Sequence, residues 1–91
     1  MLRFDPEPAE VYRTLRKNAA QGELFDRVRQ VCGELNDDHG QAHLRRHRFT
    51  QPPLWYITVA DRTDIWVILW EQSPDDQADA IIRYIGPASF A

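Results

Sequence analysis

Leu54-Trp55-Tyr56-Ile57-Thr58-Val59-Ala60 and Ile65-Trp66-Val67-Ile68-Leu69-Trp70 are the two stretches that decide the fold. Both are rich in β-branched and aromatic residues, which favour strands. The polar run Asp61-Arg62-Thr63-Asp64 between them indicates a hairpin connection. The second stretch is apolar on both faces, so it is predicted to be a central strand that is at least partly covered on both sides.

Two helices are predicted ahead of this hairpin. Asp5-Pro6-Glu7 has the signals of a helix start, namely a capping carboxylate, a proline at the first helical position and an acid in the first turn. Four apolar residues mark one face of the second helix: Leu24, Val28, Val31 and Leu35. Helices joined by a short turn pack as an antiparallel hairpin, and we expect this one to cover a face of the sheet.

Two further elements complete the prediction. Residues 42–49 are expected to form a polar edge strand, followed by a turn at Gln51-Pro52-Pro53. Ser73-Pro74-Asp75-Asp76 has a capping hydroxyl, a proline and two acids, which indicates a helix start. Apolar residues then follow at helical spacing: Ala78, Ile81, Ile82 and Ile85. The sequence therefore predicts a C-terminal helix that ends before Gly86-Pro87.

Length and composition limit the class of protein. The 91 residues, 43% hydrophobic and 27% charged, are expected to form a single domain over 1–91. Its predicted class is α+β, an N-terminal helical hairpin packed on a small antiparallel sheet with a C-terminal helix. No apolar run approaches the roughly 20 residues that span a bilayer. One cysteine cannot form an internal disulfide, and Met1–Pro6 lacks the apolar core of a signal peptide, so a cytoplasmic protein without a membrane partner is expected.

Positive charge is concentrated in His43-Leu44-Arg45-Arg46-His47-Arg48, although the formal net charge is −3. On a strand, His43, Arg45 and His47 would share one face, and Arg46 and Arg48 the other. Guanidinium groups bind phosphate through paired hydrogen bonds. Arg45, Arg46 and Arg48 are therefore predicted to bind the phosphates of RNA. The alternative is an edge strand that uses its charges to prevent aggregation between sheets.

The aromatic residues divide into two groups. Trp66 and Trp70 lie among Ile, Val and Leu, which predicts that both belong to the core. Tyr56 shares a strand face with Thr58, and it is the better candidate for an exposed functional face.

Metal and cofactor sites are not predicted. His39, His43 and His47 recur every four residues, but Gly40 interrupts any helix that would gather them. On a strand this spacing separates the rings by about 13 Å at roughly 3.3 Å per residue. The sequence also lacks a G-x-S-x-G motif, a Gly-rich phosphate loop and a C-x-x-C pair.

The order of the predicted elements resembles the RelE/ParE superfamily of toxin–antitoxin toxins. The resemblance rests on Leu2-Arg3-Phe4-Asp5-Pro6, the helical hairpin, the basic strand and the paired strands 54–60 and 65–70. For RelE-like members it implies a concave sheet face that cleaves mRNA on the ribosome. The RNA 2′-hydroxyl is activated there and arginines stabilise the phosphate without a metal.

The resemblance implies a function and a site. The expected function is that of a RelE-like toxin with a cognate antitoxin, a ribosome-associated mRNA endonuclease or an inactive relative. Its expected catalytic residues are His47, Tyr56 and Arg46, because a histidine is a natural base near neutral pH. The alternative is a non-catalytic binding module, either a ParE-like gyrase inhibitor or a regulatory domain.

Two positions differ from the family pattern. Leu54-Trp55 stand where an arginine often opens the strand after the basic one. Active members also tend to have a Tyr or His near a C-terminal strand. Here that segment, which includes Tyr84, is predicted to be helical. A helix at this place is more typical of the non-nuclease branches.

Overall fold

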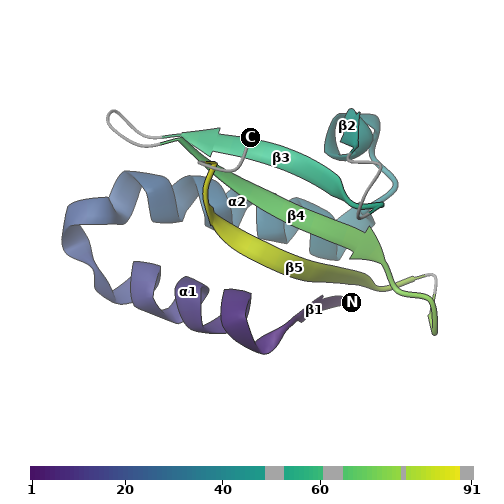
Figure 1. The fold of residues 1–91 in the computed structure, drawn as a ribbon, viewed down its shortest axis with the longest axis horizontal. Coiled ribbons are helices and arrows are strands. Elements are labelled where there is room, and N and C mark those ends of the chain that lie inside the picture. Colours follow the sequence, from purple (N-terminus) through teal and green to yellow (C-terminus); the bar gives the residue numbers. More distant parts are fainter. Residues whose placement is uncertain (49–52, 61–64, 77, 89–91) are drawn as a thin grey trace.

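Most helical residues lie in the first half of the chain and most strand residues in the second. The computed structural model describes residues 1–48, 53–60, 65–76 and 78–88. In chain order (Figure 1) the elements are β1 (Leu2–Phe4), α1 (Pro6–Lys17), the short 3₁₀ helix η1 (Ala19–Gln21), α2 (Gly22–Asp38), a second 3₁₀ helix η2 (Ala42–Arg45), β2 (His47–Arg48), β3 (Trp55–Ala60), β4 (Ile65–Gln72) and β5 (Ala80–Pro87).

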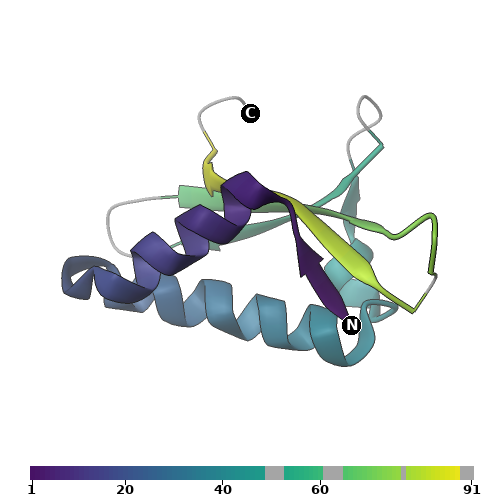
Figure 2. The same ribbon diagram turned by 90° about the horizontal axis from the view of Figure 1, so that it is seen from below.

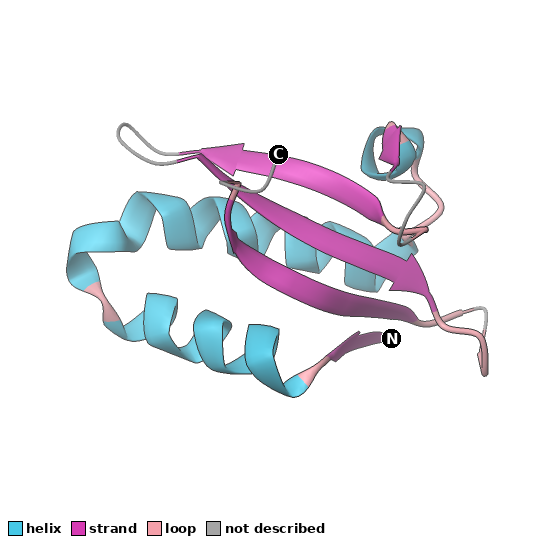
Figure 3. Ribbon diagram, in the orientation of Figure 1, coloured by secondary structure: helices cyan, strands magenta, loops and turns pink. Residues whose placement is uncertain are grey.

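The strands form one mixed sheet in the order β1-β5-β4-β3-β2. Strands β2 to β5 are antiparallel to their neighbours, whereas β1 runs parallel to β5 (Figure 3). The prediction of an α+β fold is thus confirmed, but the wholly antiparallel sheet is wrong. A parallel pair needs a long crossover connection. Here nearly the whole chain lies between Leu2 and its partner Ala80.

The helical hairpin packs on one face of this sheet, as predicted (Figure 2). Leu24, Val28 and Leu35 are buried, and Val31 is half-buried against them. The helix-side core also includes Ile68 and Trp70 of β4. No helix in the described ranges covers the opposite face of the sheet, which we call the open face. None of the described helices is long and apolar enough to cross a membrane.

The predicted C-terminal helix is wrong, because residues 80–87 form β5. A β-bulge explains the misleading pattern. Leu69 of β4 faces Tyr84, but the next residue, Trp70, faces Ile82, so Arg83 is an extra residue in β5. Ile82 and Ile85 both point into the core with two residues between them. A strand interrupted in this way has the apolar spacing of a helix.

The predicted helix start at Ser73 forms a turn. The Ser73 hydroxyl accepts hydrogen bonds from the backbone N–H groups of Asp75 and Asp76, at 3.2 and 3.3 Å. These are the bonds expected of a capping residue, but here they close a turn of the kind that Ser and Thr often form. The chain then enters β5 at Ala80.

The predicted edge strand over 42–49 is also wrong for most of its length. Residues 42–45 form η2, and β2 is only two residues long. Residue 49 of that predicted strand lies outside the described residues. So do most of the predicted turn at 51–53 and all of the hairpin connection at 61–64.

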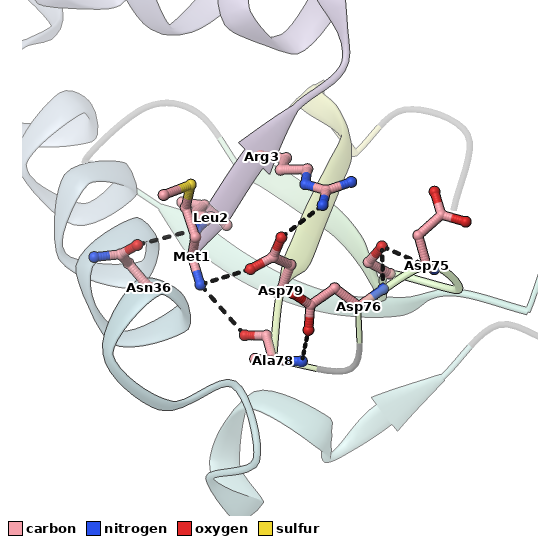
Figure 4. Close-up of polar contacts among 9 residues, drawn as sticks. Met1, Leu2, Arg3, Asn36, Asp75, Asp76, Ala78 and Asp79 are labelled. Carbon is pink, nitrogen blue, oxygen red and sulfur yellow. Dashed lines mark hydrogen bonds and ion pairs between the residues drawn. The ribbon is translucent and has the colours of Figure 1, made fainter.

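Strand β1 is fixed by polar contacts with α2 and with the segment before β5 (Figure 4). The Arg3 guanidinium lies 2.7 Å from one carboxylate oxygen of Asp79, and the N-terminal ammonium lies 2.9 Å from the other. The backbone N–H of Leu2 donates to the Asn36 side-chain oxygen at 3.0 Å. The ammonium, and after it Arg3, lower the pKa of Asp79 against the opposing effect of burial.

We predict that Leu24→Ala lowers the free energy of unfolding by about 2–5 kcal/mol, because Leu24 is fully buried between the hairpin and the sheet. Urea denaturation measures the change. Ile65→Ala is the control, since Ile65 is 63% exposed, and it should cost less than about 1 kcal/mol. Equal losses for both variants would contradict the observed packing.

We predict that Asp79→Asn destabilises the protein at pH 7 and that its difference from the parent shrinks on acidification. A carboxylate with a lowered folded-state pKa contributes stability above its unfolded pKa, about 4, and loses it as the pH falls through the folded value. Thermal melts of both proteins between pH 7 and pH 2 test this. Asp26→Asn on the exposed side of α2 is the control and should change little at either pH.

Candidate functional site

A row of side chains crosses the open face at right angles to the strands. Backbone pairing places His47 of β2 opposite Tyr56 of β3, Tyr56 opposite Leu69 of β4, and Leu69 opposite Tyr84 of β5. Directly opposed residues of neighbouring strands share a face of the sheet. We call these four residues the cross-strand row: His47, Tyr56, Leu69 and Tyr84. Neighbouring strands lie about 4.8 Å apart, so the row spans about 14 Å.

Two of the predicted catalytic residues come together in this row. The rings of His47 and Tyr56 are stacked, with centroids 5.1 Å apart and planes inclined by 23°. His47 is exposed and Tyr56 is half-buried. An imidazole beside a phenol on an accessible surface provides two groups that can transfer protons to or from a bound ligand.

The β-bulge brings Arg83 and Tyr84 to the open face although they are consecutive residues. Arg83 donates through Nε to Glu71 at 2.9 Å and through Nη1 to both oxygens of Asp5, at 3.0 and 3.2 Å. Glu71, and then Asp5, raise the pKa of Arg83. Because two carboxylates balance its charge, a phosphate would have to displace one of them before it could bind Arg83.

Sequence reasoning assigned Tyr84 to a helix and gave neither it nor Arg83 a place in the site. The β-branched and aromatic content of Ile81-Ile82-Arg83-Tyr84-Ile85 was the available signal for a strand. The side chain of Tyr84 is held along β5, since its hydroxyl donates to the Pro87 carbonyl at 3.0 Å. A Cβ at Gly86 would lie only 2.5 Å from that hydroxyl oxygen, so the side chain of Tyr84 occupies the space left by this glycine.

The three predicted phosphate-binding arginines do not alternate between two faces. The guanidinium carbons of Arg45 and Arg48 both lie over the Trp55 ring, 4.5 and 4.3 Å from its centroid. Arg45 is half-buried, and its Nε donates to the carbonyl of His39, just after α2, at 2.9 Å. Arg46 is exposed and makes no hydrogen bond or ion pair with any other described residue.

The other candidate groups have structural partners. The ring of His43 contacts the Glu34 carboxylate, and the ring nitrogen Nδ1 of His39 lies 2.8 Å from Nη2 of Arg45. Within the part of the chain that the structure describes, no three His, Cys, Asp or Glu side chains are grouped to hold a metal ion. Burial raises the pKa of the Cys32 thiol to about 12, which keeps it protonated and unreactive near neutral pH.

We predict that Gly86→Ala displaces the Tyr84 ring and breaks its hydrogen bond to Pro87, because the added methyl group and the phenol cannot share the same space. Chemical shifts of the Tyr84 ring protons, measured by NMR, report the movement. Gly33→Ala is the matched control: its Cβ would meet no atom within 4 Å, and alanine in a helix gains up to about 1 kcal/mol over glycine. Unchanged Tyr84 shifts in Gly86→Ala would contradict the observed contact.

Comparisons with known proteins add no assignment. A scan against models of protein families, a search of curated proteins and a search of solved structures each gave no match. The geometry of the open face is therefore what indicates a function for this chain.

Proposed function

We propose that this protein is a RelE-like toxin of a toxin–antitoxin pair, which binds mRNA across the open face of its sheet and cleaves it as a metal-independent endoribonuclease. The observation that carries the proposal is the stacked His47–Tyr56 pair on the exposed side of the sheet. Arg46, next to His47 in the chain, is exposed and supplies positive charge at the same edge.

The proposed reaction uses these three side chains. Neutral His47 takes the proton of an RNA 2′-hydroxyl, and the 2′-oxygen attacks the adjacent phosphorus. The bond from phosphorus to the 5′-oxygen breaks, and that oxygen takes a proton from the Tyr56 hydroxyl. The products are a 2′,3′-cyclic phosphate and a free 5′-hydroxyl. Arg46 stabilises the negative charge that develops on the phosphate oxygens.

The C-terminal strand favours an active nuclease over an inactive relative with the same fold. Active RelE-like members tend to have a Tyr or His near such a strand, and Tyr84 lies on β5 in the same cross-strand row as Tyr56. Aromatic rings spaced along a sheet are also suited to single-stranded RNA, whose unpaired bases stack on them.

A non-catalytic binding module is the second candidate. It is favoured by the fact that two arginines near the site already have partners in the protein, which leaves less positive charge for RNA. Arg83 is neutralised by Asp5 and Glu71, and Arg45 is bonded to His39. A groove between α2 and β3 offers a separate place for a protein partner such as the antitoxin; among its lining residues are Glu23, Arg27, Val31 and Val59. A ParE-like inhibitor of gyrase would use the same fold without cleaving RNA.

We predict that His47→Ala lowers the rate of mRNA cleavage on ribosomes by about 10²–10⁴-fold, the usual contribution of a general base. Primer extension on ribosome-bound mRNA measures cleavage, and growth after induced expression measures toxicity. His43→Ala is the matched control, because His43 contacts Glu34 away from the row, and it should cleave like the parent. Tyr56→Phe should also cleave mRNA more slowly, while it keeps the fold of the parent.

These assays test the two candidates and the role of His47. Growth arrest with intact mRNA and inhibited gyrase supercoiling would establish the binding module. Equal cleavage by the parent and His47→Ala would remove His47 from the mechanism. Absence of both arrest and cleavage by the parent would overturn the assignment as a toxin.

A further inference from the structure

Within the described part of the chain, the basic segment, residues 43–48, is held on the sheet by a two-residue ladder. Among the residues that the structure describes, its strand, β2, pairs with β3 at His47 opposite Tyr56 and at Arg48 opposite Trp55. A ladder of two residues is far shorter than the usual strand of five or six. Side-chain contacts also hold this segment in place.

Two stacked tryptophans form the surface on which those contacts are made. The Trp55 and Trp70 rings are stacked, with centroids 4.9 Å apart and planes inclined by 27°. Trp70 is fully buried, and its indole N–H donates to the carbonyl of Leu44, within η2, at 3.2 Å. The edge of the stack is closed by His39, whose ring lies 5.8 Å from that of Trp70. Trp55 is thus a rigid aromatic surface that is continuous with the core.

Two cations of the basic segment lie on this surface. Arg48 is over the Trp55 ring at 4.3 Å, and Arg45 lies 4.5 Å from Trp55 and 5.5 Å from Trp70. A guanidinium over an indole face is attracted by the negative charge of that face, and the attraction grows as water is excluded. Arg45 also bonds the end of α2 through His39, where the helix dipole favours a cation.

We propose that Trp55 is a positioning residue, which holds Arg48 on the helix side of the sheet and so keeps His47 stacked on Tyr56 on the open face. Side chains of consecutive strand residues point to opposite faces. With Arg48 held on Trp55, His47 must project from the open face, where its ring meets Tyr56. Arg45 and Arg48 then serve as anchors, and Arg46 is the arginine of the basic segment that remains to meet a ligand.

The inference gives the basic segment two kinds of arginine. Arg46 acts directly on the phosphate, both in binding and in stabilising the developing charge, whereas Arg45 and Arg48 act on the geometry of His47. Its functional consequence rests on the proposed RNA cleavage, but the positioning itself is a property of the free protein. The two can therefore be tested apart.

NMR of the free protein tests the positioning. The carbon-bound imidazole protons of His47 should have chemical shifts displaced by the ring current of Tyr56. Trp55→Leu and Arg48→Gln should move them to the values of an unstacked histidine, whereas Trp55→Phe and Arg48→Lys should largely retain the parent shifts. Arg46→Gln is the control and should leave the stack unchanged. Arg48 is exposed, so Arg48→Gln decides the question even if Trp55→Leu fails to fold.

Cleavage kinetics provide the functional arm. Arg48→Gln should lower kcat with KM and the salt dependence of RNA binding little changed, because it misplaces the general base, whereas Arg46→Gln should lower kcat, raise KM and flatten that salt dependence, because it removes a phosphate contact. If folded Arg48→Gln keeps the parent His47 shifts, the positioning inference is overturned. If the shifts move but the parent does not cleave RNA, the proposed function fails and the positioning stands.

Discussion

The hydrogen bond from the buried Trp70 indole to the Leu44 carbonyl connects the parts of this structure that matter for function. A buried N–H without an acceptor costs about 1–3 kcal/mol, so Trp70 can be buried without penalty only where η2 lies. The same ring stacks on Trp55 and contacts His39. One side chain thereby ties the helix-side core, the end of α2 and the basic segment to a single arrangement.

The parts of the fold that follow local rules could be predicted from the sequence. The proline and acid that open α1, and the apolar spacing of α2, are set within each segment. Strand β5 could not be predicted in this way, because its bulge is defined by pairing with Leu69 and Trp70 of another strand. The two-residue interruption at Arg83 and Tyr84 converts a strand pattern into a helical one. The parallel pairing of β5 with β1 is also set by distant residues, so neither segment's own sequence indicates it.

The candidate site, like the fold, could be predicted from the sequence only in part. His47 and Tyr56 are brought together by the register of two neighbouring strands. The alternation of side chains along a strand indicates which residues share a face, but it does not give this register. Arg48 lies on the face opposite His47, as alternation predicts, but Arg45 was assigned to the wrong face. The reason is that η2 replaces most of the expected strand, and the Leu44 carbonyl within η2 accepts a hydrogen bond from a tryptophan 26 residues away. Tyr84 joins the row only through the long-range pairing of β5, which no local pattern encodes.

Strand β5 also determines when the chain can fold. It lies between β1 and β4 in the sheet, and the Asp5–Arg83 ion pair joins residues 78 positions apart. The helical hairpin has mostly local contacts and can form early, but its apolar face has no complete partner until β5 has been synthesised. Non-local pairings of this kind slow folding and leave apolar surface exposed in the meantime. During translation, the core of the helical half can therefore be completed only after β5 has been synthesised.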